Sequence, residues 1–314
     1  MKKSLILLAV VLIIMGCAPQ LEEVGESGIP FIDTGIDSET WITIPAGVFF
    51  FGSHNHQTEI GYDYDIMLTD VTNAQYAKYL NEALAVDSIH IDSAGIKGYQ
   101  PGEAFFGARH ELQIEAGDKV YVPLNERGLR IRYQSDTFTV VPGFENHPVA
   151  MVTFYGAKAY AEFYGYRLPS EKEWEKAARG TDTRPYPWGD EIARNQANYY
   201  SSHDLFHKLF AKRTLTTPVG FYNGQIYNGY KTLKGVSPYG LYDMAGNVWQ
   251  WCGDDYPDQH LRYMRGGSQA NYEYNCRVWA RNSAGPEFYG INIGFRCVRG
   301  GVAARTSQKV KSHN

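Results

Sequence analysis

Three cysteines near the C-terminal end of the chain are the residues best suited to redox or metal chemistry. Cys252, Cys276 and Cys297 show no C-x-x-C spacing, which argues against a structural zinc site. In an exported protein, an odd number of cysteines predicts either one disulfide with one remaining thiol or three buried thiols. We favour a disulfide between Cys252 and Cys276, and three buried thiols are the alternative.

Two other pairs of polar residues are weaker candidates. His54 and His56 are separated by one residue and could supply two metal ligands, but histidines in a turn are more often solvated. Asp254 and Asp255 could form an acid pair, but two aspartates after an apolar run more often begin a loop. No Ser-His-Asp arrangement or phosphate-binding loop occurs in a recognisable context.

A polar, aromatic segment around Cys276 has the composition of a binding surface. Tyrosine and tryptophan give rigid contact area, while asparagine and arginine give adaptable hydrogen bonds. The chain has 24 tyrosines, so an ordinary tyrosine-rich loop is the alternative interpretation. The candidate ligand-binding residues are Gln269, Ala270, Asn271, Tyr272, Tyr274, Asn275, Trp279, Arg281, Asn282 and Tyr289.

Local patterns predict the elements that would position these residues. Apolar alternation around Pro45–Gly47 predicts a hairpin over Trp41–Ser53. Capping boxes predict two helices, one starting after Thr72 and one after Ser170. A further helix is expected over 153–165, and 87–147 is punctuated by Gly and Pro as in an irregular meander. Few helices, many short strands and long loops predict an α+β domain.

The N-terminus has the pattern of an export signal. Lys2 and Lys3 precede an apolar run, Leu5–Met15, of about 11 residues, which is too short to cross a bilayer because spanning requires about 20. The run ends at a glycine followed by Cys17, which resembles the bacterial lipobox. We therefore predict a signal peptide over 1–16 and lipid modification of Cys17.

Composition divides the rest of the chain into three parts. Residues 17–40 are rich in Gly, Pro and acidic residues and predict a lipidated, flexible tether. Ala18, rather than an aspartate, follows the modified cysteine and favours a surface-exposed outer-membrane location in the bacterial envelope. Residues 41–300 form the expected domain and 301–314 a polar tail. The net charge of −4 and the lack of a basic patch exclude nucleic acid as an expected partner.

Several segments occur in the order known from one enzyme family. They read IPAGVFFFGS, DVTNAQYAKYLN, HPVAMVTFYGAKAY, YRLPSEKEWEKAARG, YPWGDE, GLYDMAGNVWQW, MRGGS and NIGFRCVR. Together they resemble the formylglycine-generating enzyme (sulfatase-modifying factor) family across almost all of 41–299. The resemblance implies an elaborated C-type-lectin-like fold with little regular secondary structure.

The resemblance also implies where a catalytic copper site would lie. Active members carry two cysteines after the Gly-Gly-Ser turn, and these hold Cu(I), which activates oxygen to convert a substrate cysteine into formylglycine. Counted from Ser268, the first position is Asn271 and the second is Cys276. Cu(I) is soft and binds amides poorly, so we expect no copper. Cys276 is at most a remnant of a catalytic site.

Two further expectations come from the resemblance. Family members bind Ca²⁺ through positions that correspond to Asp243, the carbonyls of Gly246 and Val248, and Gln250 in place of a glutamate. Oxygen ligands of this kind suit Ca²⁺, so a structural Ca²⁺ is predicted, with a plain hydrogen-bonded turn as the alternative. The family's disulfide partner of Cys297 is replaced by Ala161, which predicts a buried Cys297 thiol.

These patterns predict a lipid-anchored surface protein whose C-terminal loops bind a protein or glycan ligand. The chain also resembles retroelement-diversified variable lipoproteins such as the treponemal variable protein, so the segment could be sequence-variable. Two alternatives remain. One is an enzyme, either a copper thiol oxidase of the same family or a divergent oxygenase; the other is a structural lipoprotein of an envelope complex.

Overall fold

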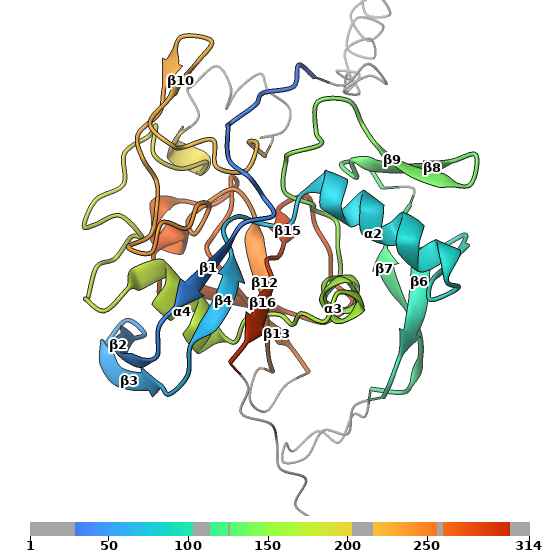
Figure 1. The fold of residues 1–314 in the computed structure, drawn as a ribbon, viewed down its shortest axis with the longest axis horizontal. Helices are drawn as coiled ribbons and strands as arrows, with labels where there is room; N and C mark the ends of the chain where they lie inside the picture. Colours follow the sequence, from blue (N-terminus) through green and yellow to red (C-terminus); the bar gives the residue numbers. More distant parts are fainter. Residues whose placement is uncertain (1–28, 103–113, 125, 203–215, 256–259, 302–314) are drawn as a thin grey trace, which may run out of the picture.

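The computed structural model describes residues 29–102, 114–124, 126–202, 216–255 and 260–301 (Figure 1). The predicted signal peptide, Cys17 and residues 302–314 of the predicted tail lie outside these residues. Within the described part of the chain, no helix is both long and apolar enough to span a membrane.

Regular structure is sparse, as the α+β prediction requires. The helices are α2 (Asn73–Ala85), α3 (Phe154–Phe163) and α4 (Glu171–Arg179), with short 3₁₀ turns η1 (Tyr200–Ser202) and η2 (Glu273–Cys276). The strands are β1 (Trp41–Ile44), β2 (Gly47–Phe51), β3 (His56–Ile60), β4 (Tyr64–Met67), β5 (His90–Asp92), β6 (Gly95–Gln100), β7 (Gly117–Val122), β8 (Ile131–Gln134), β9 (Thr137–Val140), β10 (Ile226–Tyr227), β11 (Tyr230–Lys231), β12 (Trp249–Asp255), β13 (Arg262–Arg265), β14 (Arg281–Ala284), β15 (Ile293–Gly294) and β16 (Val298–Gly300).

Both predicted capping boxes are confirmed. The Thr72 hydroxyl accepts a hydrogen bond from the Gln75 backbone N–H at 3.2 Å, and the Gln75 side chain accepts one from the Thr72 N–H at 2.9 Å. Ser170 and Glu173 make the same reciprocal pair at the start of α4. These contacts satisfy N–H groups that a helix start leaves unpaired, so the two helices begin where local sequence predicts.

The predicted hairpin over Trp41–Ser53 is wrong. β1 pairs with β4, and β2 pairs with β3, all antiparallel, so the two predicted arms lie in different sheets. Alternation of apolar residues identifies a strand, but it does not specify the partner, which here lies further along the chain. β16 adds to β4, so the first and last described strands share the sheet β1-β4-β16 (Figure 1).

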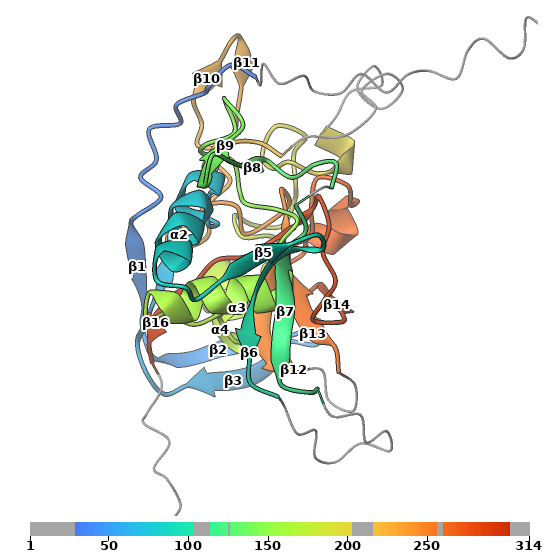
Figure 2. The same ribbon diagram turned by 90° about the vertical axis from the view of Figure 1, so that its right-hand side faces the viewer.

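The site is attached to a four-stranded sheet in the order β14-β13-β12-β15. β12 and β15 pair in parallel and the other neighbours are antiparallel. α4 lies on one side of this region next to β2 and β3, while α2 and α3 lie with β6 and β7 on the other (Figures 1 and 2).

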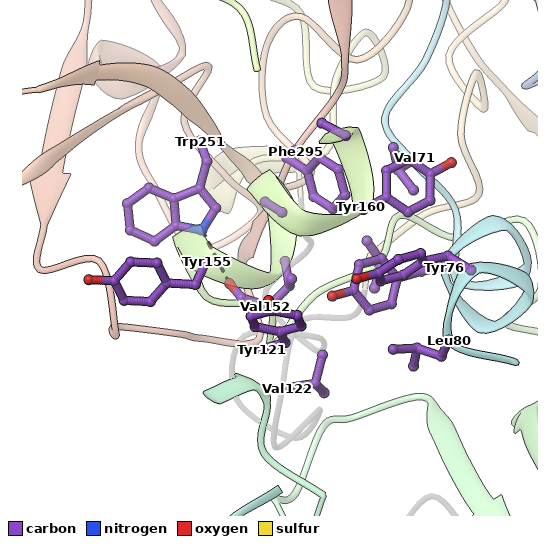
Figure 3. Packing of buried hydrophobic residues seen from close by; sticks show 14 of the residues in the cluster. Val71, Tyr76, Leu80, Tyr121, Val122, Val152, Tyr155, Tyr160, Trp251 and Phe295 are labelled. Atoms are coloured by element: carbon purple, nitrogen blue, oxygen red, sulfur yellow. Dashed lines mark hydrogen bonds between the residues drawn. The ribbon is translucent and has the colours of Figure 1, made fainter. Parts of the chain in front are cut away.

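Two apolar clusters support these layers. The larger packs α2 and α3 against the sheets, and Figure 3 shows Tyr76, Tyr160 and Phe295 grouped beside α3. Its Trp251 donates a hydrogen bond from Nε1 to the Val152 carbonyl at 3.1 Å. The second cluster surrounds Trp174 of α4 and contains residues of β1 to β4. The burial of these aromatic side chains stabilises a fold that has little regular backbone structure.

Residues 29–40 differ from the predicted flexible tether. The Ile29 N–H bonds to the Pro142 carbonyl at 3.0 Å, and the buried Thr34 hydroxyl donates to the Val219 carbonyl at 3.0 Å. The Gln75 side chain donates to the Ser38 carbonyl at 3.2 Å. These contacts tie the segment to three separate parts of the domain, so the packed domain begins by Ile29 rather than at Trp41.

Candidate functional site

The polar segment begins with a bend that only glycine can make. Gly266 and Gly267 have φ values of +95° and +70°, in the region that favours glycine. A Cβ on Gly267 would lie 2.7 Å from the Asn275 carbonyl oxygen. The bend therefore needs these residues, and it carries the chain from buried β13 to the surface.

Asn271, at the position of the first copper ligand, is held by the protein itself. Its side-chain oxygen accepts a hydrogen bond from the Ser268 hydroxyl at 2.6 Å, and its N–H bonds to the Ser268 carbonyl at 3.0 Å. Its carbonyl accepts from the Tyr200 N–H at 2.8 Å. The carboxamide oxygen is thus engaged in positioning the loop.

Cys276 is completely buried, with 0% of its surface exposed. It packs with Tyr186, Ala197, Tyr199 and Ala245 in a small apolar cluster. Burial, with a smaller effect of Glu273, raises the pKa of the Cys276 thiol to about 12. A thiol in this environment stays protonated at neutral pH, whereas metal binding and nucleophilic attack both need a thiolate. A single protonated thiol beside an engaged amide does not fit a Cu(I) site.

The expected disulfide is not present. Cys252, Cys276 and Cys297 are all free and buried, so the alternative of three buried thiols is the correct one. Cys252 packs in the cluster around α4 and Cys276 in a different cluster, because strand β12 and turn η2 bury their side chains in separate places. The predicted buried Cys297 thiol is confirmed, and it lies in the same cluster as Ala161.

The candidate binding residues fall into three classes of exposure. Tyr272 and Tyr274 are 58% and 61% exposed. Gln269 is only 1% exposed and lies in the interior, so it is not part of the surface. Its backbone N–H pairs with the Asn247 carbonyl at 3.0 Å, which turns the residue inward. The remaining members are exposed in the case of Ala270, Arg281 and Asn282, and half-buried in the case of Asn271, Asn275, Trp279 and Tyr289.

Some of these residues point to other parts of the molecule. The Tyr289 hydroxyl donates to Glu126 at 3.3 Å. Arg281 lies 3.5 Å from Glu171 of α4, and its guanidinium stands over the Tyr263 ring. The central group is therefore Tyr272, Tyr274 and their neighbours on η2.

The structure adds residues to this group that sequence reasoning missed. The Tyr200 ring lies 4.6 Å from the Tyr272 ring, centroid to centroid. Arg277 stands over Tyr274 and Trp279, with its guanidinium carbon 5.0 Å and 5.8 Å from their ring centroids. Arg277 lies between two predicted binding residues and could have been found from that position. Tyr200 is far away in sequence, and no local signal marks it.

The residues predicted to bind Ca²⁺ form a buried hydrogen-bonded turn. The Gln250 carboxamide oxygen accepts from Trp174 Nε1 at 2.7 Å and from Arg296 Nε at 2.8 Å, and its amide donates to the Asp243 carbonyl at 2.7 Å. An Asp243 carboxylate oxygen accepts from the Gly220 N–H at 2.7 Å, and burial raises the Asp243 pKa to about 6. Gly246 and Val248 are buried beside them. A cation bound by Gln250 would have to displace two existing hydrogen bonds, and the Ca²⁺ site stays a prediction.

The weaker metal and acid candidates have structural roles or fall outside the described residues. An Asp254 carboxylate oxygen accepts from the Glu171 N–H at 2.5 Å, so it stabilises the start of α4. The rings of His54 and His56 lie 6.1 Å apart in a turn, and no group of three or more His, Cys, Asp or Glu suited to a metal occurs in the described part of the chain. The sequence analysis overlooked an H-x-x-x-H pair, His203 and His207, which lies outside the described residues.

The family described as "Sulfatase-modifying factor enzyme 1-like domain" matches residues 32–300. The chain belongs to this family. Its match extends N-terminal to Trp41, in agreement with the packing of residues 29–40. The sequence-based family prediction is thereby confirmed.

Curated relatives are related over part of their length. The chain is 36% identical over 203 residues to the serine/threonine-protein kinase pkn1 of Chlamydia caviae, covering 58% of this chain and 29% of that protein. It is 35% identical over 198 residues to the formylglycine-generating enzyme of Streptomyces coelicolor, covering 55% of this chain and 59% of the enzyme. It is 35% identical over 161 residues to the inactive C-alpha-formylglycine-generating enzyme 2 of Bos taurus, covering 49% and 50%. The chain thus spans less than two thirds of the length of each.

A solved structure supports the fold. The structure of PvdO from Pseudomonas aeruginosa superposes with a TM-score of 0.51 at 22% identity, covering 82% of this chain and 93% of PvdO. At this identity the likeness supports the fold alone.

Proposed function

We propose that this chain is a binding protein built on the formylglycine-generating-enzyme scaffold rather than a thiol oxidase. The observation that carries the proposal is the state of the two copper-ligand positions. Asn271 replaces the first thiol and its oxygen is bonded to Ser268, while Cys276 is buried and its pKa is raised to about 12. The residues present do not fit Cu(I), so no catalytic step is derived through copper.

The surface above these positions supports a binding role. Tyr272 and Tyr274 expose most of their rings on a short turn, η2, that is tied down on its inner side. The Tyr186 hydroxyl donates to the Glu273 carbonyl at 3.3 Å, and the Tyr200 N–H bonds to Asn271. A rigid turn that presents aromatic rings loses little conformational entropy when a ligand binds. The ligand classes that suit such a surface are a protein or a glycan, and the segment could be sequence-variable.

The comparisons are compatible with either activity class. One relative is named as a formylglycine-generating enzyme and another as an inactive form of one, so membership in the family does not decide catalysis. The enzyme and the structural envelope lipoprotein are therefore the competing functions that the experiments below must exclude.

The setting of the protein is part of the same proposal. The sequence pattern at Cys17 supports a lipid anchor that places the domain on the bacterial cell surface, at the outer membrane. A structural Ca²⁺ near Asp243 is retained as a proposal, and the net charge of −4 makes nucleic acid an unsuitable partner.

The test is a Cu(I) titration of the purified full chain against competing thiol chelators, with oxygen uptake followed on a cysteine-containing peptide. We expect no stoichiometric copper and no uptake. Tight copper binding with peptide-dependent uptake would overturn the proposal and make Cys276 catalytic.

A matched variant identifies the cause of an inactive result. Asn271→Cys supplies the missing thiol at the position of the first ligand. Copper binding that appears only in this variant would show that the wild-type chain lacks the ligand, not the scaffold.

A further inference from the structure

Arg277 is the charged side chain at the centre of the proposed binding surface. It is half-buried, and its guanidinium stands over the rings of Tyr274 and Trp279. It also lies beside the Tyr186 hydroxyl, where it opposes the rise in pKa that burial causes for Tyr186. Arginine held by aromatic rings in this way loses little freedom when it forms a further bond.

Among the residues that the structure describes, no carboxylate forms an ion pair with Arg277. The nearest acid in sequence, Glu273, accepts a hydrogen bond from the Ser201 hydroxyl at 3.3 Å on the η1 side. Arg281, further along, lies 3.5 Å from Glu171. The positive charge of Arg277 is therefore not neutralised by its own surroundings.

Another arginine shows what a neutralised version looks like. Arg299 stands over the Trp41 ring at 4.5 Å, as Arg277 stands over Tyr274, but its Nε also lies 3.1 Å from an Asp65 carboxylate oxygen. The two sites share the stacked guanidinium and differ in the carboxylate. At Arg277 the carboxylate is left for a ligand to supply.

We propose, building on the binding function above, that the surface around Arg277 recognises an acidic glycan. The sugar carboxylate binds the Arg277 guanidinium through paired hydrogen bonds, a geometry in which arginine is superior to lysine. The apolar face of the sugar ring lies on the exposed ring of Tyr274 or Tyr272. The half-buried amide of Asn275, two residues before Arg277, is placed to bond sugar hydroxyls.

The experiment compares acidic and neutral sugars that are otherwise alike. The full chain is titrated by calorimetry with 3′-sialyllactose against lactose, and with cellobiouronic acid against cellobiose, which separates sialic from uronic acids. We expect at least one acidic sugar to bind about tenfold more tightly than its neutral partner, the size of one charge-assisted contact. Higher salt should reduce this preference.

Variants assign the preference to one residue. Arg277→Gln should reduce the affinity for the acidic sugar to that of the neutral one, and Arg277→Lys should retain part of the preference. Arg299→Gln, the matched control, should leave binding unchanged. A thermal unfolding midpoint close to wild type for Arg277→Gln would show that the variant is folded.

Three outcomes would overturn this inference: equal binding of acidic and neutral sugars, no binding of either acidic sugar, or an acid preference that survives Arg277→Gln. Arg277-dependent binding of a hexaglutamate peptide without sugar binding would also overturn it, because the ligand would then be an acidic peptide. Failure of the proposed function looks different, since it requires copper binding and oxygen uptake.

Discussion

Two arginines on either side of the Gly-Gly bend have opposite surroundings. Arg265 is 0% exposed and donates from Nε to Glu171 at 2.7 Å, from Nη2 to Glu175 at 2.9 Å and from Nη1 to the Val278 carbonyl at 3.0 Å. Arg277 has aromatic rings around it and no ion-paired carboxylate among the described residues. The same side chain is structural in one place and available to a ligand in the other, and the difference lies in the acids that α4 supplies.

Trp279 lies at the boundary between the two regions. Its ring has the guanidinium carbon of buried Arg179 at 5.1 Å and that of Arg277 at 5.8 Å. Arg179 is paired with Glu175 at 3.1 Å, so it belongs to the α4 network. The network thereby anchors the inner side of the surface that carries Arg277.

The largest expected effect is loss of the Arg265 charge. Arg265→Met leaves Glu171 and Glu175 buried without their main partner, and breaking a buried ion pair of this kind costs about 3 kcal/mol or more. Urea unfolding followed by tryptophan fluorescence measures the change. A loss below about 1 kcal/mol would show that the network relaxes and does not anchor the surface.

A smaller effect is expected from Asp243, a buried carboxylate bonded to the Gly220 N–H rather than ion-paired as those of α4 are. Its folded pKa of about 6 lies above the ordinary 3.8, so the folded state retains a proton that the unfolded chain releases. Its contribution therefore decreases as pH rises from about 4 to 6, by about 2 kcal/mol. Asp243→Asn should lack this decrease.

The difference in unfolding free energy between wild type and Asp243→Asn, measured at pH 4, 5 and 6, isolates this one group. A constant difference would contradict the raised pKa. Adding Ca²⁺ in the same experiment tests the predicted site, because Ca²⁺ bound at Asp243 should stabilise wild type and not the variant.

Arg277→Met is the direct counterpart of Arg265→Met. Only contacts with aromatic rings are lost, so the free energy of unfolding should fall by about 1 kcal/mol or less. Unfolding in urea under the same conditions gives the comparison. Equal losses for Arg265→Met and Arg277→Met would remove the distinction between a structural and a ligand-facing arginine.

The smallest effect on stability is expected for Tyr274→Ala. The ring is 61% exposed, and surface substitutions usually change stability by about 0.5 kcal/mol or less. The same variant should weaken binding of both acidic and neutral sugars, because the ring contacts the sugar and not its charge. Calorimetry alongside urea unfolding separates the two roles.

Much of the scaffold could be predicted because the relevant contacts are local. Thr72 with Gln75 and Ser170 with Glu173 are three residues apart, and each pair satisfies the start of one helix. The order of segments was sufficient for the family, which the match over residues 32–300 confirms. The change from cysteine to Asn271 is also visible in the sequence alone.

The chemistry of the site depended on contacts between distant parts of the chain. Asn271 is held by Tyr200, Gln269 is turned inward by Asn247, and Cys276 is buried by residues 186–245. Arg277 could be read from the sequence as a residue, but not as a guanidinium without a carboxylate. The sequence by itself determined the local starts of helices, the family and the missing thiol. Only the tertiary structure decided strand partners, burial and charge pairing, because these depend on which distant residues come together when the whole chain packs.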